Sequence, residues 1–295
     1  MSPEGSERWL RRGPALIDHI TRLEIPKGSI GLWYLGLASF AMKTPHHIFY
    51  FDPYFRNPID EKGRSIRQYP PPFAGGDIRH ADFVLCSHPH LDHLDPVTLE
   101  PLAMASPQAT FIVPAPAVMR CENMGIQPER ILAARTDQPI QFENYVITPL
   151  AVAHVEFETD ENDDHINLSY VVDTGQLVLY HAGDTVDFPH FAETLKSFPI
   201  DIALLPINGN DRHRRAAGIF GNLDFREAVD LAVDSGVKLL IPMHYDLLPN
   251  NQTNPAYLID YLYHTYPWMP FRMLALGECL LQDTSTLVQR FGESE

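Results

Sequence analysis

Three histidines and an aspartate fall within six residues of this 295-residue chain, at His88, His90, Asp92 and His93. They follow an apolar run over 83–86 that is typical of a buried strand. Asp-Pro at 95–96 then suits the N-cap and first position of a helix. Because α/β proteins place their functional sites on such strand-to-helix connections, the cluster predicts an α/β fold with its site here.

The residue types in this cluster indicate metal binding. Imidazole nitrogens and carboxylate oxygens suit zinc, manganese and iron. If the loop is extended, His88 and His90 point the same way, whereas Asp92 and His93 turn off to a second point. That geometry favours two metals side by side. The alternative is a polar loop whose histidines cluster without a ligand, and four ligand residues at this spacing argue against it.

The spacing His-x-His-x-Asp-His resembles the signature of the metallo-β-lactamase superfamily of binuclear hydrolases. The resemblance implies three more ligands downstream, each at a strand end. Apolar runs do precede three suitable residues: His154, Asp184 and His244. An acidic run over 156–164 follows the first of them and is interpreted as a solvated loop, and His165 after it is the substitute if His154 is not the ligand.

Carried over position by position, the resemblance implies two divalent cations as cofactors, held by histidines and aspartates. The residues are His88, His90 and His154 for the first cation, Asp92, His93 and His244 for the second, and Asp184 as the bridge between them. Paired cations lower the pKa of a shared water to roughly 7 and polarise a carbonyl or phosphoryl oxygen. Asp92 would also act catalytically, orienting the nucleophile and shuttling a proton. Manganese, zinc and iron all fit these donors, but a flavodiiron-type redox centre has Glu where this chain has His90.

Strand and helix patterns alternate along the chain, which supports an α/β fold. The expected strands are 30–36, 40–42, 48–53, 83–86, 109–113, 202–205 and 238–241, with a β-rich stretch over 140–180 and two terminal strands ending near Gln289. The expected helices are 96–105, 115–124, 188–197, 224–236 and 255–266. The resemblance implies how they stack, as a four-layer αββα sandwich.

The chain shows no linker, low-complexity run or internal repeat, so we expect a single domain over 1–295. Residues 1–28 are interpreted as an N-terminal helical extension, since Trp9, Leu16 and Ile20 fall at near-helical spacing. Residues 54–80, rich in proline, glycine and charge, form a long loop that is either a surface excursion or a partial lid over the site.

Composition limits the partners and the compartment. The net charge of −16, from 22 basic and 38 acidic residues, argues against nucleic-acid or anionic-membrane binding, although local basic residues leave room for a small anionic substrate. No stretch approaches the roughly 18 apolar residues of a membrane span, and no apolar signal-peptide segment follows the N-terminal arginines. Three separated cysteines without C-x-x-C fit a reducing cytoplasm, with Cys86 as a buried thiol.

A basic segment over 208–215 follows a predicted strand in an otherwise acidic chain. It contains the candidate substrate-binding residues Asn208, Arg212, Arg214 and Arg215. Arginine forks match phosphate or carboxylate bidentately, so a basic loop near a two-metal centre is a candidate anion clamp. The alternatives are a solvated surface loop and a subunit contact.

Segments over 26–36, 179–185, 201–205 and 241–246 are similar to the L-ascorbate-6-phosphate lactonase branch of the superfamily. That similarity implies hydrolysis of the lactone of a phosphorylated sugar acid, a divalent metal such as manganese, and a homo-oligomer. The chain departs from the branch in being shorter, with a compact segment between Asp52 and His88. The alternatives are a phosphodiesterase or ribonuclease on the same scaffold, and a non-catalytic metal-binding protein, which the seven intact ligand positions argue against.

Overall fold

The computed structural model describes residues 12–283, and these residues build two β-sheets. The first sheet contains, in spatial order, β13 (Cys279–Asp283), β1 (Ser29–Gly36), β2 (Ser39–Lys43), β3 (Ile48–Phe51), β4 (Phe83–Leu85), β5 (Thr110–Pro114) and β6 (Ile131–Ala134). The second contains β12 (Leu239–Met243), β11 (Ile202–Pro206), β10 (Val178–His181), β9 (Leu168–Asp173), β8 (Val146–Ala151) and β7 (Ile140–Gln141). Each sheet combines antiparallel hairpins with a parallel section, which is β3 to β6 in one and β10 to β12 in the other.

The two sheets pack face to face, and β1 shows how its sequence achieves this. All eight of its residues are buried, so the strand is covered on both faces. Leu32 and Tyr34 point into the cluster shared with the second sheet, whereas Trp33 and Leu35 point into the cluster under the helices. The alternation of side chains along a strand thus supplies two separate apolar layers from one continuous apolar run.

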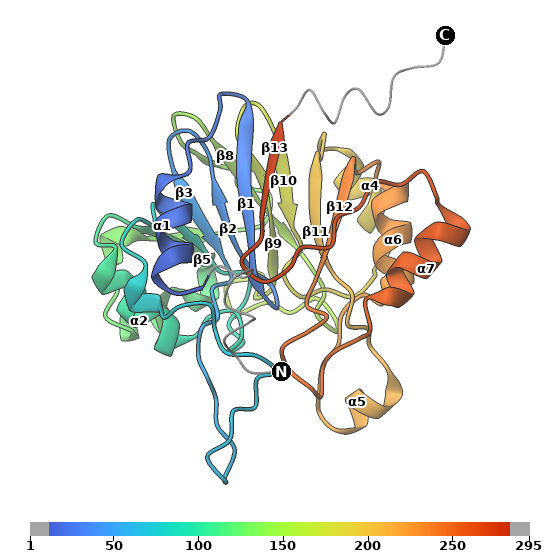
Figure 1. Ribbon diagram of the computed structural model, residues 1–295, viewed down its shortest axis with the longest axis horizontal. Helices are drawn as coiled ribbons and strands as arrows, with labels where there is room; N and C mark the ends of the chain where they lie inside the picture. The colour runs from blue at the N-terminus through green and yellow to red at the C-terminus, as the bar shows by residue number, and fades with distance from the viewer. Residues whose placement is uncertain (1–11, 284–295) are drawn as a thin grey trace.

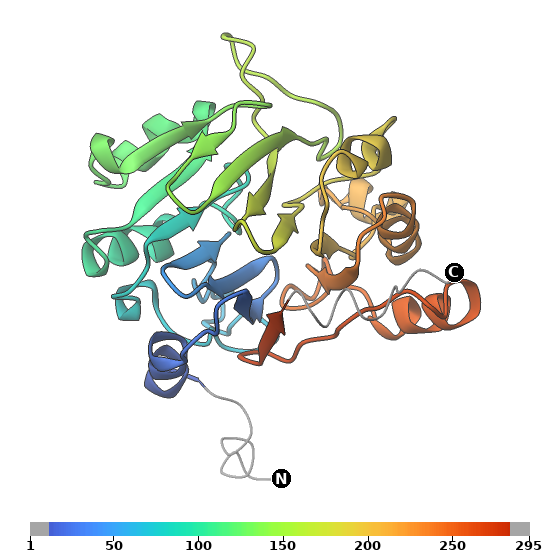
Figure 2. The same cartoon turned by 90° about the horizontal axis from the view of Figure 1, so that it is seen from above.

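Helices cover the outer face of each sheet (Figure 1). On the first sheet these are α1 (Pro14–Arg22), α2 (Pro96–Ala105) and α3 (Val118–Asn123), and on the second α4 (Phe191–Lys196), α6 (Phe225–Asp234) and α7 (Ala256–Thr265). The remaining helical segments are α5 (Arg212–Ala216) and the 3₁₀ turns η2 (Gly75–Asp77), η3 (Ala115–Ala117) and η4 (Pro128–Arg130). The view from above shows the same layering (Figure 2). The expected four-layer αββα sandwich is therefore confirmed.

Local sequence signals account for where several helices begin. The Asp95 side chain accepts from Val97 N, and Pro96 takes the first helical position of α2. Asp224 and Glu227 form a capping box that opens α6. The predicted helix over 188–197 begins later, at Phe191, because His190 adopts a left-handed backbone with φ 69°.

Other differences from the sequence prediction lie near the two ends. Of the two terminal strands expected, β13 lies within the described residues and ends with them at Asp283. The proposed strand end at Gln289 and the position of Trp9 lie outside the described residues. Cys86 is fully buried, as predicted. No helix within residues 12–283 is long and apolar enough to cross a membrane.

The connections after β3 and after β11 project from the same edge of the sandwich, the lower one in Figure 1. The first is the loop over 54–80, whose outer part is closed by an isolated bridge between Ile59 and Ser65. The second carries α5. The metal-loop residues follow β4 between these two projections, so the candidate site lies at this edge.

Candidate metal centre

The loop after β4 divides its four candidate ligands into two pairs. His93 N and Leu94 N both donate to His90 O, at 3.1 and 2.8 Å, so the chain coils into a turn after His90. The sequence prediction assumed an extended loop, but this loop is extended only in part. The turn nevertheless separates His88 and His90 from Asp92 and His93 as predicted.

The first set of candidate ligands, here called the three-histidine group, consists of His88, His90 and His154. One ring nitrogen from each lies within 4.8 Å of the others. His88 Nε2 is 3.0 Å from His90 Nδ1, and the His154 ring centroid is 5.2 Å from that of His88. His154 comes from the second sheet, just beyond β8, so both sheets supply this group.

The second set, here called the carboxylate group, consists of Asp92, His93, Asp184 and His244, whose ligand atoms also lie within 4.8 Å of one another. Asp184 Oδ1 is 3.2 Å from His93 Nε2 and 3.3 Å from His244 Nε2. Its other oxygen, Oδ2, lies 3.7 Å from His154 Nε2 in the three-histidine group. Asp184 thus turns one oxygen to each group, which is the geometry a bridging ligand needs.

Unpaired polar atoms show that a cation fits between these residues. His93 Nε2, Asp184 Oδ1 and His244 Nε2 are buried, and the oxygen lies 3.2 and 3.3 Å from the two nitrogens, yet the three atoms are not aligned to hydrogen-bond to one another or to any other group. Buried polar atoms in folded proteins are almost always paired, so this concentration in one place calls for an explanation. Nitrogen and carboxylate donors directed at one point are what a divalent transition metal requires.

The histidines of the two groups have opposite pKa shifts. Burial lowers the pKa of His88 and of His154, which leaves these rings neutral. Burial also acts on His93 and His244, but the surrounding carboxylates, led by Asp184, outweigh it and raise both pKa values, that of His244 to about 10. The imidazolium rings in turn hold the pKa of Asp184 well below its usual range despite burial. The carboxylate group therefore favours positive charge.

Asp52 supports the carboxylate group from behind, a role the sequence analysis did not assign. Its Oδ2 lies 2.7 Å from His93 Nδ1 and also accepts from Ser87 Oγ, while Oδ1 accepts from Ser87 N. Bonding one ring nitrogen of His93 leaves Nε2 directed at the site and fixes the ring orientation. The available signal was the Asp-Pro pair that ends a buried strand next to β4.

Close backbone packing brings the two sheets together at the site. Gly183 has φ 60°, and a Cβ there would lie 2.6 Å from Ser87 Cβ. Only glycine allows the chain before Asp184 to approach the metal loop this closely. The position fixes the distance between Asp184 and His93, ligands from different sheets.

His154, and not His165, joins the candidate ligands. His165 pairs with Thr159 in an isolated bridge that closes the acidic run, and its ring faces Phe157. The side chains of the run are mostly exposed, as expected for a solvated loop. Asp160 Oδ1 accepts from two backbone nitrogens of that run. The run therefore stabilises its own turn.

The basic segment is not a loop as predicted, because residues 212–216 form the short helix α5, with Asp211 as N-cap. Of its arginines, Arg214 is tied down, with Nε 2.7 Å from Asp211 Oδ2 and NH1 donating to Asn251 Oδ1. Arg215 donates to Asn210, and Arg212 is exposed.

Phe220, which the sequence analysis did not single out, connects the α5 segment to the site. Its ring lies 6.1 Å from that of His154 and is 51% exposed, so it forms part of the rim. Asn208, at the start of the segment, is buried and donates to Asn251, while Asn222 donates to Asn208. The arginines therefore belong to a segment that contacts the candidate site through Phe220, while Arg214 and Arg215 bond to Asp211, Asn251 and Asn210 and not to the ligand groups.

Comparison with known proteins shows the same fold in other chains. The family described as Beta-lactamase superfamily domain matches residues 47–245. A UPF0173 metal-dependent hydrolase of Caldivirga maquilingensis is 24% identical over 76% of this chain and 86% of its own. A probable L-ascorbate-6-phosphate lactonase of Salmonella choleraesuis is 23% identical over 82% of this chain and 77% of its own. The solved structure of a metallo hydrolase from Ignicoccus hospitalis covers 86% of this chain and 99% of its own, with a TM-score of 0.65 and 18% identity.

Proposed function

The chain belongs to the β-lactamase superfamily domain family, and we propose that it is a metal-dependent hydrolase that opens the lactone of a phosphorylated sugar acid. The observation that carries the hydrolase assignment is the convergence of two ligand groups on the shared residue Asp184. The relatives named above support the same reaction class, and one of them carries the lactonase name.

In this proposal the three-histidine group and the carboxylate group each hold one divalent cation, manganese or zinc, with iron as the third option. When bound, such a pair supplies an activated water at neutral pH and polarises the carbonyl under attack. The seven ligand residues position these charges, Asp52 orients His93, and Gly183 allows the chain before Asp184 to approach the metal loop of the other sheet.

Asp92 is suited to move a proton during the reaction. Its side chain is 24% exposed, whereas that of Asp184 is 5% exposed, so Asp92 can reach a substrate. Burial acts to raise the pKa of Asp92, but His93 and His244 outweigh it and lower that pKa. A deprotonated carboxylate at neutral pH can take a proton from the nucleophile and pass it to the leaving alkoxide.

The α5 segment supports an anionic substrate. It carries Arg212, Arg214 and Arg215 and lies against the rim of the site through Phe220. Guanidinium groups at this mouth would bind the phosphate of the substrate while its lactone carbonyl lies over the metals. Because Arg214 and Arg215 already donate to protein partners, the exposed Arg212 is the arginine best placed to offer its donors to a substrate.

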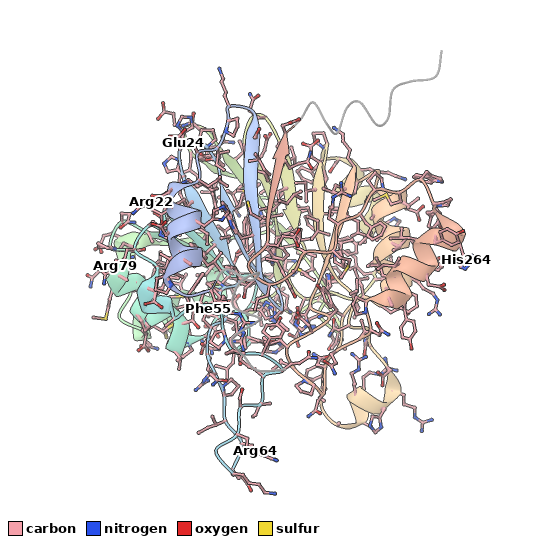
Figure 3. The ribbon with its side chains drawn as sticks, in the orientation of Figure 1. Arg22, Glu24, Phe55, Arg64, Arg79 and His264 are labelled. Carbon is pink, nitrogen blue, oxygen red and sulfur yellow. The ribbon has the colours of Figure 1, made fainter. Side chains whose placement is uncertain are left out.

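The test is hydrolysis by manganese- and zinc-loaded protein of two substrate panels. One panel holds phosphorylated and plain sugar lactones, and the other holds bis-(p-nitrophenyl) phosphate and cyclic nucleotides. We expect opening of the phosphorylated lactones, loss of it in Asp92→Ala, and a higher KM in Arg212→Ala. Arg22→Ala is the matched control, because Arg22 pairs with Asp18 on α1, far from α5 (Figure 3).

The outcomes separate the competing functions. Phosphodiester cleavage without lactone opening would replace the proposal with the phosphodiesterase alternative. Metal binding without turnover on either panel would favour a non-catalytic metal-binding protein. Equal KM values for phosphorylated and plain lactones would contradict recognition of the phosphate, while the lactonase reaction would still stand.

A further inference from the structure

The loop that carries His244 also carries Asp246, a side chain to which none of the roles above assigns a function. Asp246 Oδ1 accepts from Tyr34 Oη at 2.9 Å and from Leu37 N at 3.2 Å. Its other oxygen accepts from Tyr69 Oη at 2.5 Å. One carboxylate thus accepts from three donors in two distant parts of the chain, namely β1 with the turn that follows it and the loop over 54–80.

The contact with Leu37 leads directly to a candidate metal ligand. His244 N donates to Leu37 O at 2.8 Å, so Leu37 is held by Asp246 through its nitrogen and holds His244 through its oxygen. Both Leu37 and His244 have left-handed backbones, with φ 57° and 56°. Non-glycine residues persist in this region only when their surroundings hold them there. Asp246, two residues after His244 in the same loop, accepts from Leu37 N and so helps to keep Leu37 in this conformation.

The contact with Tyr69 leads to the loop over 54–80, which projects from the same edge of the sandwich as the candidate site. Residues 67–69 of this loop are here called the rim segment. Gln68 N donates to Leu247 O at 2.8 Å, beside the Tyr69–Asp246 hydrogen bond. Leu37, Tyr54 and Leu247 form a small buried cluster against which Tyr69 packs. The segment over 67–69 is therefore fixed to the His244 loop by two hydrogen bonds and an apolar contact.

The donors at Asp246 stay protonated. Burial and then Asp246 itself raise the pKa of Tyr34 and of Tyr69. Both hydroxyls therefore stay protonated near neutral pH and remain hydrogen-bond donors to Asp246.

From this geometry we infer that Asp246 is a positioning residue that sets the direction of His244 and couples the rim segment over 67–69 to the metal centre. The inference rests on the proposed function, because it takes the carboxylate group as a metal site. Metal binding that orders His244 then also stabilises the attachment of the rim. By reciprocity, loss of the attachment weakens the metal.

The test compares Asp246→Ala and Tyr69→Phe with the wild type. Asp230→Ala is the matched control, since Asp230 accepts from Tyr261 Oη at 2.8 Å between α6 and α7, away from the site. Manganese and zinc affinities come from competition with a chelating dye. Absorption of the cobalt-loaded proteins reports ligand geometry, and hydrogen exchange reports the Gln68 amide with and without metal.

We expect Asp246→Ala to weaken one of the two cations by roughly 10- to 100-fold, as residues that support a metal ligand do. The cobalt spectrum changes, and metal no longer slows exchange of the Gln68 amide. Tyr69→Phe, which removes one of the hydrogen bonds of the attachment, speeds that exchange and weakens metal binding by less than Asp246→Ala does. Asp230→Ala leaves both as in the wild type. If Asp246→Ala does not fold, Asp246→Asn takes its place, with a smaller change in the same direction.

Wild-type affinities and an unchanged cobalt spectrum in a folded Asp246 variant would overturn the inference. So would continued protection of Gln68 by metal in that variant. A wild-type chain that binds no divalent metal would overturn the proposed function instead. The exchange rates of the metal-free proteins would then still decide whether Asp246 holds the rim.

Discussion

The three-histidine group and the carboxylate group share Asp184 and lie side by side, yet their electrostatics differ. In the first, burial and neighbouring imidazoles lower the pKa of His88 and of His154 and keep these two rings neutral. In the second, carboxylates raise the pKa of the same type of side chain far enough to keep it charged. Residue type therefore does not determine how strongly a site attracts a cation. The attraction for a cation depends on how many buried carboxylates lie close to the histidines.

The strongest way to break this comparison is to remove the residue that both groups share. Asp184→Ala removes the carboxylate oxygen that lies 3.2 Å from His93 Nε2 and 3.3 Å from His244 Nε2, together with the oxygen beside His154. We expect both cations to be lost, with affinity falling by more than the roughly 100-fold typical of a supporting residue. Metal content after dialysis measures the loss of the cations, and competition with a chelating dye measures the fall in affinity. Asp187→Ala, an exposed carboxylate in the same connection, is the control.

A smaller change should affect one group alone. Asp52→Asn keeps the size of the side chain but removes the charge beside His93 Nδ1. We expect roughly 10- to 100-fold weaker binding at the carboxylate group and no change at the three-histidine group. Calorimetric titration that resolves two binding events checks this. Asp82→Asn, whose carboxylate accepts from Ile48 N on β3, should change neither event. Equal weakening of both events would mean that the groups do not act separately.

Acidity should separate the groups further. Cation binding at the carboxylate group must displace the protons of His93 and His244, so its affinity should rise about tenfold per pH unit for each proton displaced. His88 and His154 have lowered pKa values and are already neutral, so the affinity of the three-histidine group should change little from pH 7 to 9. The stability of the metal-free protein should change with pH in the opposite direction, falling as pH rises. Raised pKa values contribute stability below pH 6.5, and it is lost as pH rises through about 10. Melting temperatures of both forms across this range test the prediction.

The smallest effect is expected at the neighbouring histidine. His165 closes the acidic run and joins neither ligand group, so His165→Gln should leave metal content and affinity unchanged. His154→Gln, its matched partner, should remove the cation of the three-histidine group. A loss of metal in His165→Gln would mean that the loop rearranges to bring this ring into the site.

Local signals were enough to predict much of the fold. The Asp95-Pro96 pair marked the start of α2, and the capping box at Asp224 marked that of α6. The spacing of His88, His90, Asp92 and His93 grouped them as the structure does. These signals are readable because each depends on residues only a few positions apart.

Other features depend on contacts between distant parts of the chain. Asp52 lies 41 positions before His93 and reaches it because β3 and β4 pair in parallel. Tyr34 and Asp246 are 212 positions apart. The helix α5 was predicted as a loop because its five residues are too few to show a periodic pattern, and its N-cap at Asp211 was the available signal. Phe220 had no pattern that marked it as a rim residue.

The origin of the ligands in both sheets has a consequence for folding kinetics. His88 to His93 follow β4 of the first sheet, whereas His154, Asp184 and His244 follow strands of the second. Neither half of the chain can gather a full ligand set until the sheets have docked, so we expect a cation to bind after the folding transition state. Interactions absent from the transition state change the unfolding rate. Metal should therefore lengthen the lifetime of the native state and leave the folding rate almost unaltered.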